Sequence, residues 1–206
     1  MQPHAQRVVR PACNADRESI LDVVEAAFVT EPAFGHFFGD AYQVHAREFL
    51  TFLLDLRLAG GIVWVEEADA RIAAVSMWDP PGGPSLGAIE QEALWRAAAD
   101  QFGPTIGQRL DAYDALVHDL GPTADHYYLG VIASDPAARG RGHGSAVLRP
   151  GLQAADTAGL PTFLETGTES NVGFYGRFGF EVTAELDLDD GTRVWCLTRP
   201  PGASVG

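Results

Sequence analysis

Positive charge is scarce in this sequence. Of its 206 residues, 14 are Lys or Arg and 28 are Asp or Glu, which gives a formal net charge of −14. A chain this acidic repels polyanions at long range, so we expect no nucleic-acid partner. A phosphate-containing ligand is not excluded, because backbone amides and a few local cations act over short distances. The charge is compatible with cationic small molecules.

Cysteine, paired histidine and long apolar runs are also scarce. The two cysteines, Cys13 and Cys196, lie far apart in the sequence, and we interpret them as reduced packing residues rather than a disulfide. The six histidines lack the paired spacing of a zinc site, so we expect no metal. The first twelve residues lack the apolar segment of a secretory signal, and no apolar run reaches the roughly 20 residues of a membrane span. These absences predict a cytoplasmic protein without membrane contact.

Hydrophobic residues make up 46% of the sequence, enough for one sizeable core. We predict a single domain over residues 1–199 and a flexible tail over 200–206. The elements combine antiparallel hairpins with one strand, helix, strand crossover, which predicts an α+β fold. Helical patterns cover 17–28, 46–61, most of 86–120 with a break at 103–104, 144–159 and 169–179; strand patterns cover 6–12, 62–68, 71–79, 126–136, 161–166, 180–188 and 192–199.

The stretch RGRGHGS, from Arg139 to Ser145, lies between a predicted strand and a predicted helix. Its alternate glycines let the backbone approach a ligand closely and adopt positive φ, and the following helix places its positive end behind them. Such a loop binds phosphate, although a merely flexible loop is an equally open interpretation at this point. The spacing differs from the dinucleotide-binding G-x-G-x-x-G, and no Lys-Ser or Lys-Thr pair of a P-loop follows.

Residues 139–144 fit the R/Q-x-x-G-x-G/A signature of the GNAT superfamily of N-acetyltransferases, and NVGFYGRFGF, at 171–180, resembles that superfamily's second motif. The resemblance implies a GNAT-type three-layer fold, with a mixed, mostly antiparallel central sheet flanked by helices and splayed between its fourth and fifth strands. It also implies an acyl-CoA-binding core at about 126–180. Within the superfamily, 144–166 and 193–203 resemble the puromycin N-acetyltransferases, whereas about 34–56 and 83–125 match poorly and leave the acceptor open.

The resemblance further implies that acetyl-CoA is the co-substrate and assigns residues to it. The backbone of Ile132 and Ser134 would pair with the pantetheine arm. Asn171 would hydrogen-bond near the pantetheine amides, with the N-cap of the following helix as an equally weighted alternative. Residues that would hold the pyrophosphate through their backbone N–H groups, or add charge beside it, are Arg139, Gly140, Arg141, Gly142, Gly144 and Ser145.

Two side chains are the candidates for catalysis. Tyr175 resembles the family tyrosine that protonates the leaving thiolate, and a phenol with a pKa near 10 is protonated at neutral pH. Its alternative role is that of a core aromatic. Glu165 is the first choice for the base or the ammonium anchor, with a plain surface or hydrogen-bonding carboxylate as the alternative. Glu31 and Asp79 are weaker candidates. Trp78 is interpreted as a packing residue, with a place in the wall of the acceptor cleft as its alternative role.

The resulting hypothesis is an acetyl-CoA-dependent N-acetyltransferase acting on the primary amine of a small molecule by direct attack in a ternary complex. The acceptor would be a puromycin-like aminonucleoside or another antibiotic or metabolite, which suggests a role in antibiotic resistance. The alternatives are a different acyl-CoA or carrier-bound donor, a peptide or protein amine as acceptor, and a non-catalytic acyl-CoA sensor. We expect a monomer or a homodimer.

Overall fold

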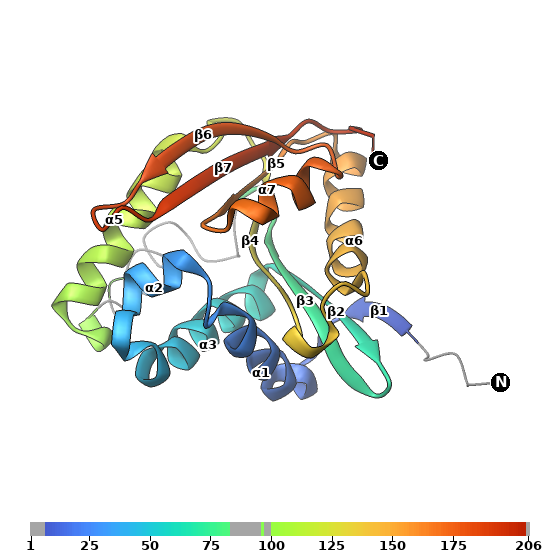
Figure 1. Ribbon diagram of the computed structural model, residues 1–206. Helices are drawn as coiled ribbons and strands as arrows, with labels where there is room; N and C mark the ends of the chain where they lie inside the picture. Colours follow the sequence, from blue (N-terminus) through green and yellow to red (C-terminus); the bar gives the residue numbers. More distant parts are fainter. Residues whose placement is uncertain (1–6, 83–95, 97–99, 205–206) are drawn as a thin grey trace.

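The computed structural model describes residues 7–82, 96 and 100–204, and the elements below refer to these residues (Figure 1). The helices are α1 (Arg17–Phe28), α2 (Pro32–Phe38), α3 (Tyr42–Gly60), α5 (Pro104–Leu120), α6 (His143–Ala158) and α7 (Glu169–Gly176). The strands are β1 (Arg7–Pro11), β2 (Ile62–Ala68), β3 (Arg71–Asp79), β4 (Tyr127–Ser134), β5 (Thr162–Thr166), β6 (Glu181–Asp187) and β7 (Arg193–Arg199).

The seven described strands form one mixed sheet in the order β1-β2-β3-β4-β5-β7-β6. All neighbouring strands are antiparallel except β4 and β5, which pair in parallel. That parallel pairing is short, since it joins only Tyr127 to Thr162 and Tyr128 to Phe163. The strands separate beyond these residues, which confirms the predicted GNAT-type fold and its splay between the fourth and fifth strands.

Helices cover both faces of the sheet. Helices α1 and α3 pack on the face of β2 to β4 that carries Val75 and Met77, whereas α6 packs on the opposite face. Figure 1 shows α6 standing on the right of the view and the β6–β7 hairpin crossing the top, with α7 below it. Because side chains alternate along β3, its residues contribute to two separate apolar clusters.

Trp78 shows how the second cluster is built. Its side chain is fully buried, and its Nε1 donates to Ser76 Oγ at 2.9 Å, while Ser76 Oγ donates to the Val147 carbonyl of α6 at 2.7 Å. A Cβ at Gly151 would lie 2.1 Å from the Trp78 ring, so α6 needs glycine where it crosses β3. The packing role of Trp78 is therefore confirmed, and its alternative role in the wall of the acceptor cleft is wrong, because the strand's alternation places this side chain under α6.

Local sequence patterns missed helix α2. Its signals are Glu31, whose carboxylate caps the helix by accepting from the Phe34 N–H, and Pro32 at the first helical position. The helix predicted from residue 46 begins earlier, at Tyr42, and α5 begins after the predicted break at Gly103. The helical pattern assigned from residue 86 falls partly on 83–95 and 97–99, which lie outside the described residues.

The chain beyond β7 stays near the body of the protein over its described residues. The Gly202 N–H donates to Asp156 Oδ1 at 2.7 Å, and the Ala203 carbonyl accepts from Arg199 Nη2 at 2.9 Å. The flexibility expected of this tail stays a prediction. Among the described helices, none combines the length and apolar character required to cross a membrane.

Candidate active site

A cavity of about 710 Å³ opens where β4 and β5 separate. Its walls come from helices α1, α2, α3, α5 and α7, from strands β4 and β5, and from the glycine loop before α6. Of the residues predicted for catalysis or acetyl-CoA binding, Arg141 and the weaker base candidate Asp79 lie outside its lining. The predicted residues that line it are Ile132, Ser134, Arg139, Gly140, Gly142, Gly144, Ser145, Glu165, Asn171 and Tyr175.

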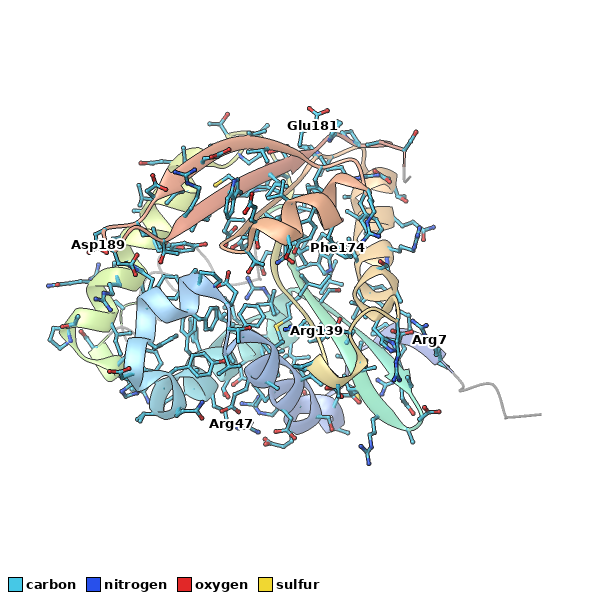
Figure 2. The ribbon with its side chains drawn as sticks, viewed as in Figure 1. Arg7, Arg47, Arg139, Phe174, Glu181 and Asp189 are labelled. Atoms are coloured by element: carbon cyan, nitrogen blue, oxygen red, sulfur yellow. The ribbon has the colours of Figure 1, made fainter. Side chains whose placement is uncertain are left out.

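The glycine loop forms one end of this cavity. Gly140 and Gly142 have φ of 78° and 82°, a region that side chains with a Cβ rarely adopt, and a Cβ on either would meet no neighbouring atom. Gly142 is the N-cap of α6, whose first N–H groups have no intrahelical acceptor. Backbone donors and the helix dipole therefore favour an anion here. Figure 2 shows exposed Arg139 on this loop.

Contacts among polar side chains connect the glycine loop to the sheet. His143, the first residue of α6, is buried, and its Nδ1 lies 2.7 Å from Glu66 Oε2. Glu66 is 1% exposed and its Oε1 accepts from Arg7 Nε at 2.6 Å, while Arg7 Nη1 donates to the Arg141 carbonyl at 3.1 Å. These contacts join residues that are 59 to 134 positions apart, so no local pattern reveals them.

Strand β4 presents one unpaired backbone edge to the cavity. Ile132 and Ser134 pair with Ser76 and Ala74 of β3 on one side, and β5 has left their other side. Such an edge can accept an extended amide-containing chain as an added strand. The register of β3 against β4 shifts at Gly130, where a Cβ would lie 2.2 Å from Arg57 Nη2.

Asn171 lies at the start of α7 but does not cap it. The helix begins at Glu169, and its N-cap is Thr168, so the alternative role proposed for Asn171 is wrong. Its Nδ2 donates to Thr166 Oγ1 at 3.0 Å, which holds the side chain across the end of β5. The amide lines the cavity and keeps its carbonyl oxygen for a further partner.

Glu165 is the central titratable group of the cavity. Its Oε1 accepts from the Tyr128 hydroxyl at 2.6 Å, and its buried Oε2 has no hydrogen-bond partner in the described part of the chain. Burial raises the pKa of Glu165 to about 7, against the opposing effects of the Tyr128 hydrogen bond and the positive charge of Arg57. A carboxyl group with this pKa exchanges protons near neutral pH.

Three tyrosines from different elements surround this carboxylate. Burial raises the pKa of Tyr113, Tyr128 and Tyr175, and the negative charge of Glu165 adds to the rise in each case. All three phenols are therefore protonated at neutral pH. Tyr113 and Tyr128 were missed in the sequence, yet Tyr128 shares the i, i+2 alternation of Ile132 and Ser134, which was a usable signal.

The two weaker base candidates differ in position. Asp79 pairs with the buried Arg57 guanidinium, with 2.6 Å between its Oδ2 and Arg57 Nη2, and it is absent from the cavity lining. Glu31 lines the cavity, and its two oxygens accept from the N–H groups of Phe34 at 3.1 Å and Gly167 at 3.0 Å. Burial raises the pKa of Glu31 despite these hydrogen bonds.

One wall of the cavity is apolar and aromatic. Phe34 meets Phe28 edge to face with ring centroids 4.6 Å apart, and Phe37 meets Tyr113 in the same way at 4.9 Å. These rings come from α1, α2 and α5, so three helices build one surface. The apolar and aromatic residues of this wall are Phe28, Phe34, Phe37, Phe49, Leu53, Leu110, Tyr113 and Val117.

Comparison with known proteins agrees with this arrangement. Residues 105–180 match the family model of the acetyltransferase (GNAT) family. The chain also resembles the solved structure of a histone acetyltransferase HPA2 and related acetyltransferase from Corynebacterium glutamicum, with 24% identity, a TM-score of 0.69, and coverage of 97% of this chain and 99% of that one.

Two further structures support the same fold. The Drosophila melanogaster polyamine N-acetyltransferase, which catalyses the formation of N-acetylagmatine, is 15% identical with a TM-score of 0.71, over 95% of this chain and 100% of that one. A GNAT family acetyltransferase from Brucella melitensis in complex with acetyl-CoA is 21% identical with a TM-score of 0.52, over 98% and 94%. The family model covers residues 105–180, and the solved structures share the fold of this chain.

Proposed function

We propose that this acetyltransferase moves an acetyl group from acetyl-CoA to the primary amine of a small molecule, by direct attack within a ternary complex. One observation carries the proposal: a single cavity is lined by the glycine loop, the unpaired edge of β4, Glu165 and Tyr175. The donor and the acceptor can therefore meet without a covalent enzyme intermediate. The similar structure that contains acetyl-CoA supports the choice of donor.

The donor half follows from the backbone. The pyrophosphate would lie against the N–H groups of residues 139–145, with Arg139 adding charge at the mouth. Arg141 lies outside the cavity lining, so its part would be limited to long-range charge. The pantetheine arm would run along Ile132 and Ser134, with Asn171 near its amides.

Glu165 would act as the base. An ammonium must lose a proton before its nitrogen can attack the thioester, and a carboxylate with a pKa of about 7 accepts that proton at neutral pH. The new C–N bond then forms as the C–S bond breaks, and the departing sulfur needs a proton.

Tyr175 would supply that proton. The charge of Glu165 is one cause of its raised pKa, so protonation of Glu165 removes that cause and makes the phenol a stronger acid. Proton transfer from the amine to Glu165 thus favours the later proton transfer from Tyr175 to the sulfur. This order of events fits direct transfer, in which both proton movements belong to one turnover.

The acceptor is proposed by chemistry. The acidic chain and the carboxylates of the cavity suit a cationic amine, and solved structures of similar fold include a polyamine acetyltransferase. The resemblance of 144–166 and 193–203 to the puromycin N-acetyltransferases makes a puromycin-like aminonucleoside, and with it a cytoplasmic role in antibiotic resistance, the finer proposal.

The test measures free thiol released from acetyl-CoA with puromycin, agmatine or a simple arylalkylamine, against a control without amine, and identifies the product by mass. Amine-dependent release with an acetylated product supports the proposal. If thiol release requires a larger acyl-CoA or a carrier-bound donor, the proposed donor is wrong. If it requires a peptide amine, the proposed acceptor is wrong. Acetyl-CoA binding without turnover on any amine would contradict an enzymatic role and favour a sensor.

A further inference from the structure

We propose that the acceptor site takes an amine with one positive charge and an aromatic group, and that Glu31 anchors its ammonium while Glu165 removes the proton. The inference rests on the proposed function and adds the substrate class and a division of roles between the two carboxylates. Its evidence is the placement of Glu31, the partners of each carboxylate, and the aromatic wall.

The fold brings the two carboxylates to the same end of β5. Glu31 precedes α2, yet its Oε1 accepts from the N–H of Gly167, two residues after Glu165. A Cβ at Gly167 would lie 2.7 Å from Glu31 Oε1, so glycine is needed for this approach. The negative charge of Glu31 is also one of the causes that raise the pKa of Glu165, which reflects their proximity.

The hydrogen-bond partners of the two carboxylates differ. Both oxygens of Glu31 accept backbone N–H groups, at 3.1 Å from Phe34 and 3.0 Å from Gly167, so its position is fixed and its charged form is stabilised against the opposing effect of burial. Glu165 accepts one hydrogen bond from Tyr128, and Oε2 has none among the described residues. A fixed carboxylate suits the binding of an ammonium, whereas a carboxylate with an unpartnered oxygen suits proton transfer.

The wall beyond the carboxylates selects the rest of the acceptor. Phe34 and Phe37 are buried, and Phe37 contacts Tyr113 edge to face. Aromatic faces and edges favour another ring. Asp114 also lines the cavity, but burial raises the pKa of its carboxyl group, so a second ammonium or a guanidinium would lose its water beside a carboxyl group whose charged form is disfavoured.

The test compares phenethylamine with agmatine and spermidine as acceptors at saturating acetyl-CoA. We expect kcat/KM for phenethylamine to exceed both by about tenfold or more, the scale of discrimination that an apolar pocket provides. Phenethylamine binding is measured separately by calorimetry with coenzyme A present, so that it does not depend on turnover. A preference for agmatine or spermidine would overturn the inference and leave the proposed function intact.

Matched variants test the wall and the anchor. Phe37→Leu should reduce the preference for phenethylamine, whereas Phe38→Leu, on the same helix and equally buried but outside the cavity lining, should keep it. Glu31→Gln should raise the KM for the amine about tenfold with a smaller change in kcat, and Glu181→Gln, at an exposed position on β6, should change neither. If Phe37→Leu and Phe38→Leu behave alike, the aromatic wall does not select the acceptor. If no amine releases thiol while acetyl-CoA binds, the proposed function fails together with this inference.

Discussion

The pH dependence of amine acetylation depends on Glu165. Because its pKa is about 7, the ionised fraction falls to about one tenth at pH 6 and about one hundredth at pH 5. If Glu165 is the base, kcat/KM for the amine should fall tenfold per pH step on the acid side and level off above about pH 8. We call this fall of kcat/KM at low pH the acid limb. An acceptor amine with a pKa above 9 loses its own proton at a higher pH, so its titration does not overlap with the acid limb.

Tyr128 influences the pH at which the midpoint of the acid limb lies. Its hydroxyl donates to the carboxylate at 2.6 Å and stabilises the charged form, so Tyr128→Phe removes a hydrogen bond to a charged group worth roughly 1.5–3 kcal/mol. At about 1.4 kcal/mol per pH unit, the midpoint should move upward by about one to two pH units. The variant should therefore lose activity at pH 7 and recover much of it at pH 9.

The assay records thiol release from pH 5 to 9.5 for four proteins. Glu165→Gln should lower kcat/KM by about 10²–10⁴-fold and abolish the acid limb. Glu31→Gln is the control, because it removes the neighbouring carboxylate whose pKa is also raised. It should keep the fall in activity at low pH, with a lower midpoint, because the charge of Glu31 is one cause of the raised pKa of Glu165. A limb that survives in Glu165→Gln, or a midpoint that stays in place in Tyr128→Phe, would refute the reasoning.

Three further outcomes follow from the geometry. Tyr175→Phe should lower kcat by about 10²-fold or more while calorimetry shows unchanged acetyl-CoA binding, because only the proton for the departing sulfur is lost. Gly142→Ala should raise the KM for acetyl-CoA, because a φ of 82° strains any residue with a Cβ by about 1–2 kcal/mol, and Gly173→Ala within α7 should bind acetyl-CoA normally. Arg57→Met should lower the free energy of unfolding by about 3–5 kcal/mol, because it leaves the largely buried Asp79 carboxylate without its cation. Urea titration measures this loss, and the double variant with Asp79→Leu should recover part of it.

The fold was largely predictable from local patterns. Strands β2 and β3 follow from two strand-like runs on either side of Asp69 and Ala70, and the glycine loop with its helix follows from RGRGHGS. Helix α2 was missed because seven residues carry too little periodicity, so that only the capping residue and the proline mark its start. The alternative role of Trp78 in the cleft wall stayed open in the sequence, because local sequence does not fix which face of a central strand meets α6.

The residues that would bind the donor through their backbone were predictable from the sequence. Contacts between side chains from distant segments were less predictable. The donor residues follow one another along β4, the loop and α7, so one sequence segment contains them. The contacts Tyr128 to Glu165 and Glu31 to Gly167 span 37 and 136 positions, and they depend on how the sheet brings its strands together. The roles of these residues stay predictions until they are measured.

The most direct test of the account is a crystal structure with a bisubstrate analogue, in which phenethylamine is joined through an acetyl linker to the sulfur of coenzyme A. The account predicts the pyrophosphate against the N–H groups of residues 139–145, the amide nitrogen within hydrogen-bond distance of Glu165, and the sulfur beside the Tyr175 hydroxyl. An analogue bound with its amide nitrogen away from both Glu165 and Tyr175 would contradict it.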